Sequence, residues 1–239
     1  MNSILPDTVL SNADVNQVIV THRTGGSSEL ATKISSLPHK PRFFDITGDL
    51  SKAGDPALVI STARFWLKKY HSEQKIDTLV NNAGVEVVKP LGEITPEDFA
   101  TVYDLNVRGT LLMTQEVLPL LPSKGRIINI SSVGSRAGFP SLGLYCSSKA
   151  AIEGLTRCWA AELGGNGTTV NAVNPGPVES EMLKNIPKDI VDGQKKATPL
   201  ENRVGTVEEV ANVVAWLAGE DSGWVTGQTI SASGGWAMY

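Results

Sequence analysis

Short apolar runs alternate with longer amphipathic stretches along most of this 239-residue chain. The apolar runs are rich in β-branched and aromatic residues, which predicts strands over 17–21, 42–46, 76–80, 126–131, 168–173 and 227–232. The amphipathic stretches predict helices over 29–36, 96–121, 145–163 and 208–218, and another that contains Phe65, Trp66 and Leu67. Strands that alternate with helices indicate βαβ units, so the pattern predicts an α/β fold with a parallel sheet.

Capping and breaking residues mark where several of these elements begin and end. Thr95 precedes Pro96, a pair typical of a helix N-cap and its first helical position. Pro119 and Pro122 then end that helix. Residues 180–203 are polar and irregular in pattern, which is typical of a mobile lid beside a binding site.

No repeat, low-complexity tract or linker divides residues 1–239, so we expect a single domain with an irregular start over 1–16. The net charge is −4 and no basic stripe is present, which argues against nucleic-acid binding. No apolar window reaches the roughly 18 residues that a membrane span needs. The first fourteen residues lack the basic and apolar regions of a secretory signal, so we expect a cytoplasmic protein.

The two cysteines do not predict a disulfide or a metal site. Cys146 and Cys158 lie in one predicted helix, at a separation of roughly 18 Å that no disulfide bridges. The only histidines, His22, His39 and His71, are remote from both cysteines in the sequence. Two small apolar thiols are the simplest interpretation.

A tyrosine and a lysine carry the clearest chemistry in the chain. Tyr145 and Lys149 stand at i and i+4, so they share one face of a predicted helix. A nearby ammonium favours the phenolate and lowers the pKa of the phenol toward neutral pH. Ser132, at the end of a separate strand, can share the proton that moves to or from a substrate oxygen. These three residues predict general acid/base catalysis of carbonyl–alcohol interconversion.

Several short motifs follow one another from residue 81 onward: Asn81-Asn82-Ala83-Gly84, Asn106, Ser132, Tyr145 with Lys149, Pro175-Gly176, Val225-Thr226-Gly227-Gln228 and Gly234-Gly235. In these motifs the chain resembles the short-chain dehydrogenase/reductase family, and especially its 3-oxoacyl-acyl-carrier-protein reductase-like members, over residues 16–236. The resemblance implies a Rossmann-type, doubly wound parallel sheet in three layers. It also implies an NADP-dependent oxidoreductase that interconverts a ketone and a secondary alcohol.

The resemblance assigns a role to each matched residue. It makes Ser132, Tyr145 and Lys149 catalytic, and Asn106 the residue whose backbone helps to hold a proton-relay water. Lys149 also contacts the ribose of the nicotinamide. The cofactor-binding residues that the same motifs imply are Asn82, Ala83, Gly84, Tyr145, Lys149, Pro175, Gly176, Val178 and Ser180.

The chain departs from the family at its beginning. The family's T-G-x-x-x-G-x-G loop brings the cofactor pyrophosphate to a helix N-terminus. Glycines at i, i+4, i+6 or at i, i+2, i+5 occur nowhere in this chain. If residues 17–21 are the family's second strand, about fifteen residues remain for a first β–α unit that takes about thirty. Arg23 then falls where a basic residue meets the 2′-phosphate of NADP, and Asp45 falls where an aspartate after the third strand contacts adenine.

A second alignment is also open. It makes residues 18–21 the first strand and residues 22–28 its loop, but it leaves one strand–helix unit unaccounted for before Arg42. Under either alignment the first β–α unit is shortened or degenerate. Because backbone amides in that unit supply much of the affinity for a dinucleotide, cofactor binding should be weakened.

Three functions therefore remain open on the sequence. The first is the NADP-dependent oxidoreductase, in which Tyr145 protonates the substrate oxygen and Ser132 binds the developing oxyanion. The second is a cofactor-independent isomerase, dehydratase or cyclase on the same fold, which the missing glycine loop favours. The third is a non-catalytic partner subunit, which predicts loss of the catalytic residues, and they are not lost.

The expected partners are a small molecule and further copies of the chain. The lid at 180–203 mixes Met182, Leu183 and Ile186 with many charges, which suits a moderately apolar substrate. The resemblance implies a homodimer or homotetramer formed through the two long helices, around 97–121 and 145–163.

Overall fold

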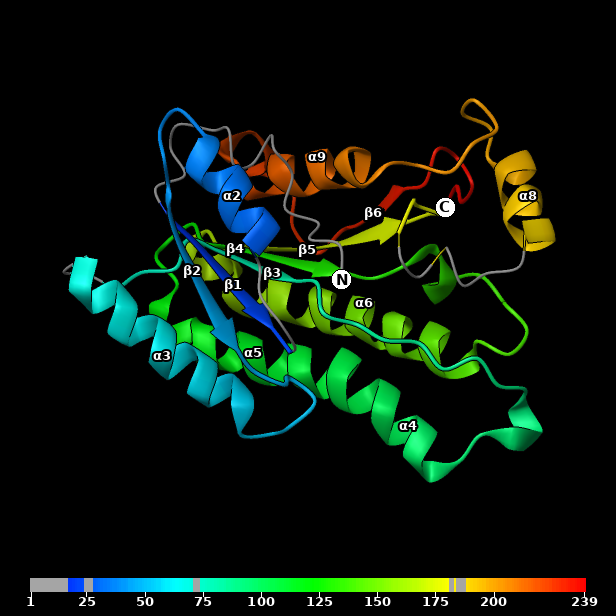
Figure 1. Cartoon of the computed structure of the whole chain (residues 1–239), viewed down its shortest axis with the longest axis horizontal. Helices are drawn as coiled ribbons and strands as arrows, with labels where there is room; N and C mark the ends of the chain where they lie inside the picture. Colours follow the sequence, from blue (N-terminus) through cyan, green and yellow to red (C-terminus); the bar gives the residue numbers. More distant parts are fainter. Residues whose placement is uncertain (1–16, 24–27, 71–73, 181–182, 184–187) are drawn as a thin grey trace.

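The computed structural model describes residues 17–23, 28–70, 74–180, 183 and 188–239. Figure 1 shows strands in the middle of the molecule with helices on both sides. The strands are β1 (Gln17–His22), β2 (Arg42–Thr47), β3 (Thr78–Asn81), β4 (Arg126–Ile130), β5 (Thr169–Pro175) and β6 (Thr229–Ala232). The helices are α2 (Ser28–Ser36), α3 (Asp55–Tyr70), α4 (Pro96–Tyr103), α5 (Thr110–Val117), α6 (Gly143–Leu163), α8 (Lys188–Ala197) and α9 (Val207–Ala218). Each predicted strand is confirmed, with its ends within two residues of the prediction.

All strand pairs are parallel, in two sheets. One sheet has the order β3-β4-β5-β6, and β1 pairs with β2 in a second sheet. Within the described residues, no strand joins β1 to β3 by hydrogen bonds, although the resemblance implied one continuous sheet. The expected irregular start over 1–16 lies outside the residues that the structure describes.

Three hydrophobic clusters hold the helices against the strands. The largest lies between the strands and helices α3, α5 and α6, and contains Ile46 of β2 as well as Leu79 of β3 and Ile127 of β4. This cluster packs residues of both sheets under one helical layer. On the opposite face, α9 packs over Ile128 and Ile130, while α2 packs over β1 and β2 (Figure 1). The arrangement is the three-layer α/β, Rossmann-type fold that the sequence predicts.

The predicted helix over 96–121 is interrupted. Thr95 caps α4 in a reciprocal capping box with Asp98, as the sequence predicts. A π-helical segment then runs over Asp104–Gly109 before α5 begins. A Cβ at Gly109 would lie 2.6 Å from the carbonyl oxygen of Leu50, so only glycine permits this approach. Single π turns are frequent at functional sites, and this one contains Asn106.

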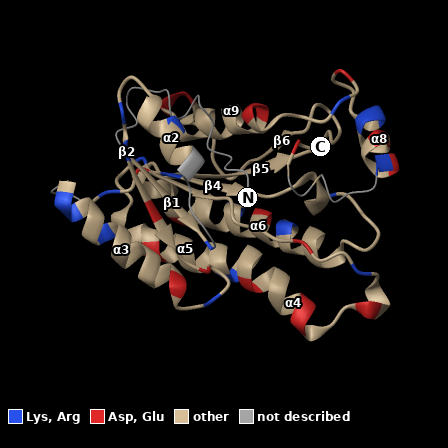
Figure 2. Ribbon diagram, in the orientation of Figure 1, with Lys and Arg blue, Asp and Glu red and all other residues tan. Residues whose placement is uncertain are grey.

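The prediction of an irregular lid over 180–203 is wrong in part, because Lys188–Ala197 forms α8. Charges of both signs cover this helix in Figure 2, and Lys188 pairs with Asp192 at 2.6 Å across one turn. None of the residues of α8 is buried, so local pairs rather than core packing support it. The rest of the lid prediction falls partly on 181–182 and 184–187, which lie outside the described residues. No helix in the described part of the chain is long and apolar enough to cross a membrane.

Candidate active site

The residues singled out in the sequence follow the carboxyl ends of the parallel strands. Asn82–Gly84 follow β3, Ser132 follows β4, and Gly176 follows β5. In open α/β sheets, ligands bind in the crevice outside these strand ends. Tyr145 and Lys149 reach the same place from the first turns of α6.

Asn106 links the loop after β3 to α6. Its Oδ1 accepts a hydrogen bond from the backbone N–H of Val85 at 2.9 Å, and its Nδ2 donates to the carbonyl of Val85 at 2.9 Å. The same Nδ2 donates to the hydroxyl of Ser148 at 3.0 Å, and that hydroxyl donates to the carbonyl of Tyr145 at 2.7 Å. The side chain of Asn106 is therefore a buried structural bridge. Its backbone role in a proton relay stays a prediction.

Ser132 and Tyr145 meet from two different elements. The hydroxyl of Ser132 caps a short 3₁₀ turn by accepting from the N–H of Gly134 at 3.0 Å. Burial raises the pKa of the Tyr145 phenol, a hydrogen bond with Ser132 lowers it, and the charge of Glu86 raises it. Because burial is the largest of these effects, the phenol holds its proton at neutral pH.

Lys149 is buried, and its ammonium donates to the carbonyl oxygen of Ile130 at 2.7 Å. Burial lowers the pKa of this lysine from 10.5 to about 8. Its Nζ lies 5.8 Å from the centre of the Tyr145 ring. The expectation that Lys149 lowers the pKa of Tyr145 is not met in this structure, because burial dominates both groups and the ammonium is bonded to the β4 backbone.

The loop after β3 passes close to this lysine. A Cβ at Gly84 would lie 3.2 Å from the Nζ of Lys149 and 3.5 Å from the Oδ1 of Asn106. Glycine therefore leaves room beside the ammonium for the atoms of a ligand. Asn82 and Ala83 lie in the same loop and are partly buried.

The segment after β5 is fixed at several points. A Cβ at Gly176 would lie 2.8 Å from the Cβ of Ser233, so this glycine allows the two loops to touch. Val178 forms an isolated parallel bridge with Gly205. The hydroxyl of Ser180 accepts from the N–H of Leu183 at 3.2 Å. Pro175 is the last residue of β5, so all four predicted residues of this segment stand at one end of the sheet.

The placement of Asp45 needs correction. Asp45 lies inside β2 opposite Val20, not after the strand, and its carboxylate is 3.3 Å from the Nε2 of His22. The acidic residue that follows the end of β2 is Asp49. A hydrogen bond from Ser51 lowers the pKa of Asp49, and the charge of Arg23 contributes to the same shift. Arg23 itself follows β1 and is exposed, so Arg23 and Asp49 both stand after the ends of neighbouring strands.

Sequence reasoning also missed Glu86. This carboxylate is half-buried two residues after Gly84, and burial raises its pKa. The loop that carries it is held on both sides, by Asn106 at Val85 and by a hydrogen bond from the N–H of Lys89 to the carbonyl of Ser141 at 2.8 Å. No pattern in the sequence separates Glu86 from a surface glutamate. Gly48-Asp49, in contrast, is a turn-forming pair that marks the true end of β2.

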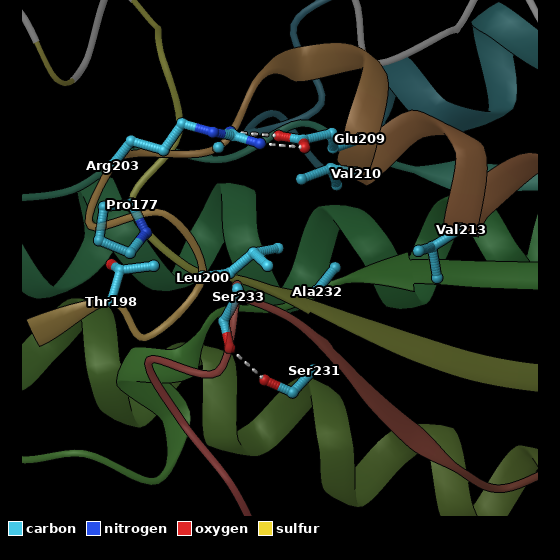
Figure 3. A pocket seen from close by; sticks show the side chains of 12 residues that line it. Pro177, Thr198, Leu200, Arg203, Glu209, Val210, Val213, Ser231, Ala232 and Ser233 are labelled. Carbon is cyan, nitrogen blue, oxygen red and sulfur yellow. Dashed lines mark hydrogen bonds and ion pairs between the residues drawn. The ribbon is translucent and has the colours of Figure 1, made fainter. Parts of the chain in front are cut away.

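A pocket of about 200 Å³ lies between the segments after β5 and β6 and the start of α9 (Figure 3). It is lined by Pro177, Thr198, Leu200, Val210 and Ser233, among others. Arg203 forms two parallel bonds to Glu209 at its rim, of 2.9 and 2.7 Å. Asn106, Ser132, Tyr145 and Lys149 do not line it. This pocket is therefore distinct from the place where Ser132, Tyr145 and Lys149 meet.

The fold and these residues together define a Rossmann-type domain with a partly buried tyrosine, a partly buried serine and a buried lysine at the carboxyl edge of the sheet. A family model described as enoyl-(acyl carrier protein) reductase matches residues 12–237. The chain therefore belongs to the short-chain dehydrogenase/reductase family.

Individual relatives agree with this family. Dehydrogenase OXI1 of Cochliobolus heterostrophus is 47% identical over 168 residues, which cover 67% of this chain and 71% of OXI1. The hydroxynaphthalene reductase-like protein Arp2 of Metarhizium acridum is 34% identical over 212 residues, or 80% of this chain and 79% of Arp2. The solved structure of the angucycline C-6 ketoreductase LanV with bound NADP is 30% identical, with a TM-score of 0.86, and covers 95% of this chain and 89% of LanV. These likenesses support an oxidoreductase of the dehydrogenase/reductase class.

Proposed function

We propose that this protein is an NADP-dependent oxidoreductase that interconverts a ketone and a secondary alcohol. The observation that carries the proposal is the convergence of Ser132, Tyr145 and Lys149 at the carboxyl edge of the sheet, where Ser132 is close enough to lower the pKa of Tyr145. A proton donor, a hydroxyl and a buried cation in one place are what carbonyl reduction needs from a protein.

Each residue has a distinct part in ketone reduction. Tyr145 keeps its proton at neutral pH because its pKa is raised, and it donates that proton to the substrate oxygen. Ser132 donates a hydrogen bond to the same oxygen as negative charge develops there. Lys149, with a pKa of about 8, is charged at neutral pH, and its part is to hold the ribose of the cofactor rather than to lower the pKa of Tyr145. In alcohol oxidation the proton moves the other way, from the alcohol hydroxyl to the phenolate of Tyr145.

The nicotinamide end of a dinucleotide fits the residues that are present. Gly84 leaves open the space beside the Nζ of Lys149, where a side chain would collide. Tyr145 and Lys149 would hold the ribose, and the loops of Asn82–Gly84 and Pro175–Ser180 would enclose the nicotinamide. When bound, the cofactor supplies or accepts the hydride.

The adenine end has fewer candidate contacts. Arg23 would bind the 2′-phosphate that distinguishes NADP, and Asp49, which follows the end of β2, would contact the adenosine. Asp45 is a weaker candidate because it lies within β2 and pairs with His22. This chain has no glycine loop of the family's pattern to bind the pyrophosphate of the cofactor. We therefore expect it to bind the dinucleotide more weakly than a protein with that loop.

The absence of the family's glycine loop from this chain favours a second candidate function. A cofactor-independent isomerase, dehydratase or cyclase would use Tyr145 and Lys149 for proton transfer alone. The raised pKa of Tyr145 suits a proton donor in either reaction. The two functions differ in whether the protein binds and consumes NADPH.

The names of the relatives suggest a substrate class. Arp2 is named for hydroxynaphthalene reduction and LanV for ketoreduction of an angucycline. We propose a moderately apolar, ring-bearing ketone for this chain. Copies of the chain would associate through α4 and α6, where Phe99 of α4 is 49% exposed and stacks on Tyr103.

The test is NADPH consumption, followed at 340 nm, with a panel of cyclic and bicyclic aromatic ketones. We expect turnover with at least one ketone and a loss of about 100-fold or more in kcat for Tyr145→Phe. Tyr70→Phe is the matched control, because Tyr70 lies on α3 and outside the site. Product formation from a ketone or enol without NADPH would favour the cofactor-independent function instead.

A further inference from the structure

The segment after β6 folds back onto the loop that carries Ser132. The ring of Trp236 lies 5.5 Å from the ring of Phe139, centre to centre. The guanidinium carbon of Arg136 lies 4.6 Å from the centre of the Tyr239 ring. Phe139 and Arg136 both belong to the stretch that follows Ser132. Two aromatic residues at 236 and 239 therefore cover one side of this loop.

The covering segment is itself fixed to β6. The N–H of Ala237 donates to the hydroxyl of Ser233 at 3.2 Å, and its carbonyl accepts from the hydroxyl of Ser231 at 3.1 Å. The N–H of Trp236 donates to the carbonyl of Ser233 at 3.0 Å. These bonds set where the Tyr239 ring lies.

A buried carboxylate lies beneath Arg136. Glu153 of α6 is 4% exposed, and its Oε2 accepts from the Nε of Arg136 at 2.9 Å. Its Oε1 accepts from the Nδ2 of Asn174 at 2.7 Å and from the hydroxyl of Ser135. Tyr239 reaches the same group of residues, because Asn174 also donates to its hydroxyl at 3.4 Å. Glu153 thus depends on Arg136 as its only cationic partner among the described residues.

Ser135 connects this ion pair to Ser132. Its N–H donates to the carbonyl of Ser132 at 3.0 Å, and its hydroxyl, which shares one proton between Glu153 and this carbonyl, lies 2.7 Å from the same oxygen. The side chain of Ser132 is held in the same turn by the N–H of Gly134. The contacts therefore run in sequence from Tyr239 through Arg136, Glu153 and Ser135 to the backbone of Ser132.

We propose that Tyr239 is a positioning residue for the acid/base site: its ring holds Arg136 on Glu153, and this fixes the turn that presents the Ser132 hydroxyl to Tyr145. The physical basis is the attraction of a cation for an aromatic face, which also excludes water from one side of the ion pair. A buried carboxylate that loses its cation is strongly destabilised, and Glu153 shares its other hydrogen bonds with Ser135 in the turn after Ser132. The proposal rests on the function proposed above, but its effect on Tyr145 is measurable without a substrate.

The chain offers a matched control for the ring and its cation. Tyr70 of α3 lies 4.7 Å from the guanidinium carbon of Arg42, a pairing much like that of Tyr239 and Arg136. Arg42 and Tyr70 stand outside the site, so Tyr70→Ala removes a comparable contact far from Ser132. Tyr239→Phe keeps the ring and removes only the hydroxyl.

The first measurement is the titration of Tyr145 in protein that contains 3,5-difluorotyrosine, followed by ¹⁹F NMR and assigned with Tyr145→Phe. Ser132 lowers the pKa of Tyr145, so a displaced Ser132 should let that pKa rise. We expect Tyr239→Ala to raise the pKa of Tyr145 in the direction of Ser132→Ala, with little change for Tyr239→Phe or Tyr70→Ala. An unchanged pKa in folded Tyr239→Ala would overturn the proposal.

The second measurement is a double-mutant cycle in the NADPH assay. Tyr239→Ala should lower kcat by about tenfold with KM nearly unchanged, which is less than the loss from removing an oxyanion donor itself. In a Ser132→Ala background the same substitution should have no further effect, because it acts through Ser132. Equal losses in both backgrounds would show a general structural role and contradict the proposal. If no ketone is turned over, the proposed function fails while the titration still decides this inference.

Discussion

The ammonium of Lys149 lies 2.7 Å from the carbonyl oxygen of Ile130, in the backbone of β4. This single bond partly offsets the cost of burying a charge, and the pKa of Lys149 falls from 10.5 to about 8. The protein therefore holds a cation that is charged at neutral pH and loses its charge as the pH rises through about 8. Burial of this charge costs stability.

The stability of the protein without cofactor should rise between pH 8 and pH 9.5. In this range the folded protein has begun to release the proton of Lys149 while the unfolded chain still binds it, so the free energy of unfolding increases with pH. The whole shift corresponds to about 3 kcal/mol. Urea unfolding at several pH values measures it.

Lys149→Met is the control for this pH dependence, because it removes the titrating group and fills similar space. The rise in stability above pH 8 should be absent in the variant. Tyr145, whose pKa is raised above 10, acts in the opposite direction only at higher pH. A stability that is flat or falling in the wild type, or that rises equally in Lys149→Met, would contradict the assignment.

Glu86→Gln should lower the pKa of Tyr145. The carboxylate of Glu86 raises that pKa by its charge, so the neutral amide makes the phenolate easier to form. Ser132→Ala should do the reverse, since it removes a hydrogen bond that lowers the pKa. The ¹⁹F titration described above reads both changes. Glu93→Gln, at an exposed residue before α4, should leave the pKa of Tyr145 unchanged. If both substitutions shifted that pKa equally, the effect would not be specific to Glu86.

Gly109→Ala should destabilise the fold by about 1–3 kcal/mol through overpacking. The new methyl group would lie 2.6 Å from the carbonyl oxygen of Leu50, which is backbone and has little freedom to move. Gly154→Ala in the middle of α6 is the matched control, because a Cβ there has no neighbour closer than 4.0 Å. That variant should be about 0.5–1 kcal/mol more stable, since alanine favours a helix over glycine. Equal effects of the two substitutions in urea unfolding would contradict the close approach at Gly109.

Much of the fold could be predicted from local pattern. The strands are short apolar runs bounded by turn residues, so β4 and β5 are found within two residues of the prediction. The i, i+4 spacing of Tyr145 and Lys149 also placed both residues correctly on α6. The direction of the lysine ammonium could not be predicted, because it depends on a backbone carbonyl of β4 that is remote in sequence.

Other features depend on contacts that periodicity does not carry. The π-helical segment that contains Asn106 ends at Gly109, which lies against the backbone of Leu50. The apolar pattern of the sequence is continuous there, so it does not predict this segment. The resemblance to the family predicted that Asp45 follows the strand and contacts adenine, whereas β2 continues past Asp45 to Thr47. The helix α8 was missed because it buries no apolar face, and that face is what marks most helices.

A binding titration decides whether this site binds NADPH although the chain has no glycine loop of the family's pattern. NADPH is added to the purified protein while tryptophan fluorescence is followed, with NADH, Arg23→Ala and the exposed α3 variant Arg64→Ala in parallel. We expect saturable NADPH binding, weaker binding of NADH, and a loss of affinity of about tenfold or more for Arg23→Ala only. No saturable NADPH binding by the cooperatively folded protein would contradict the account and leave Tyr145 and Lys149 to chemistry without a redox cofactor.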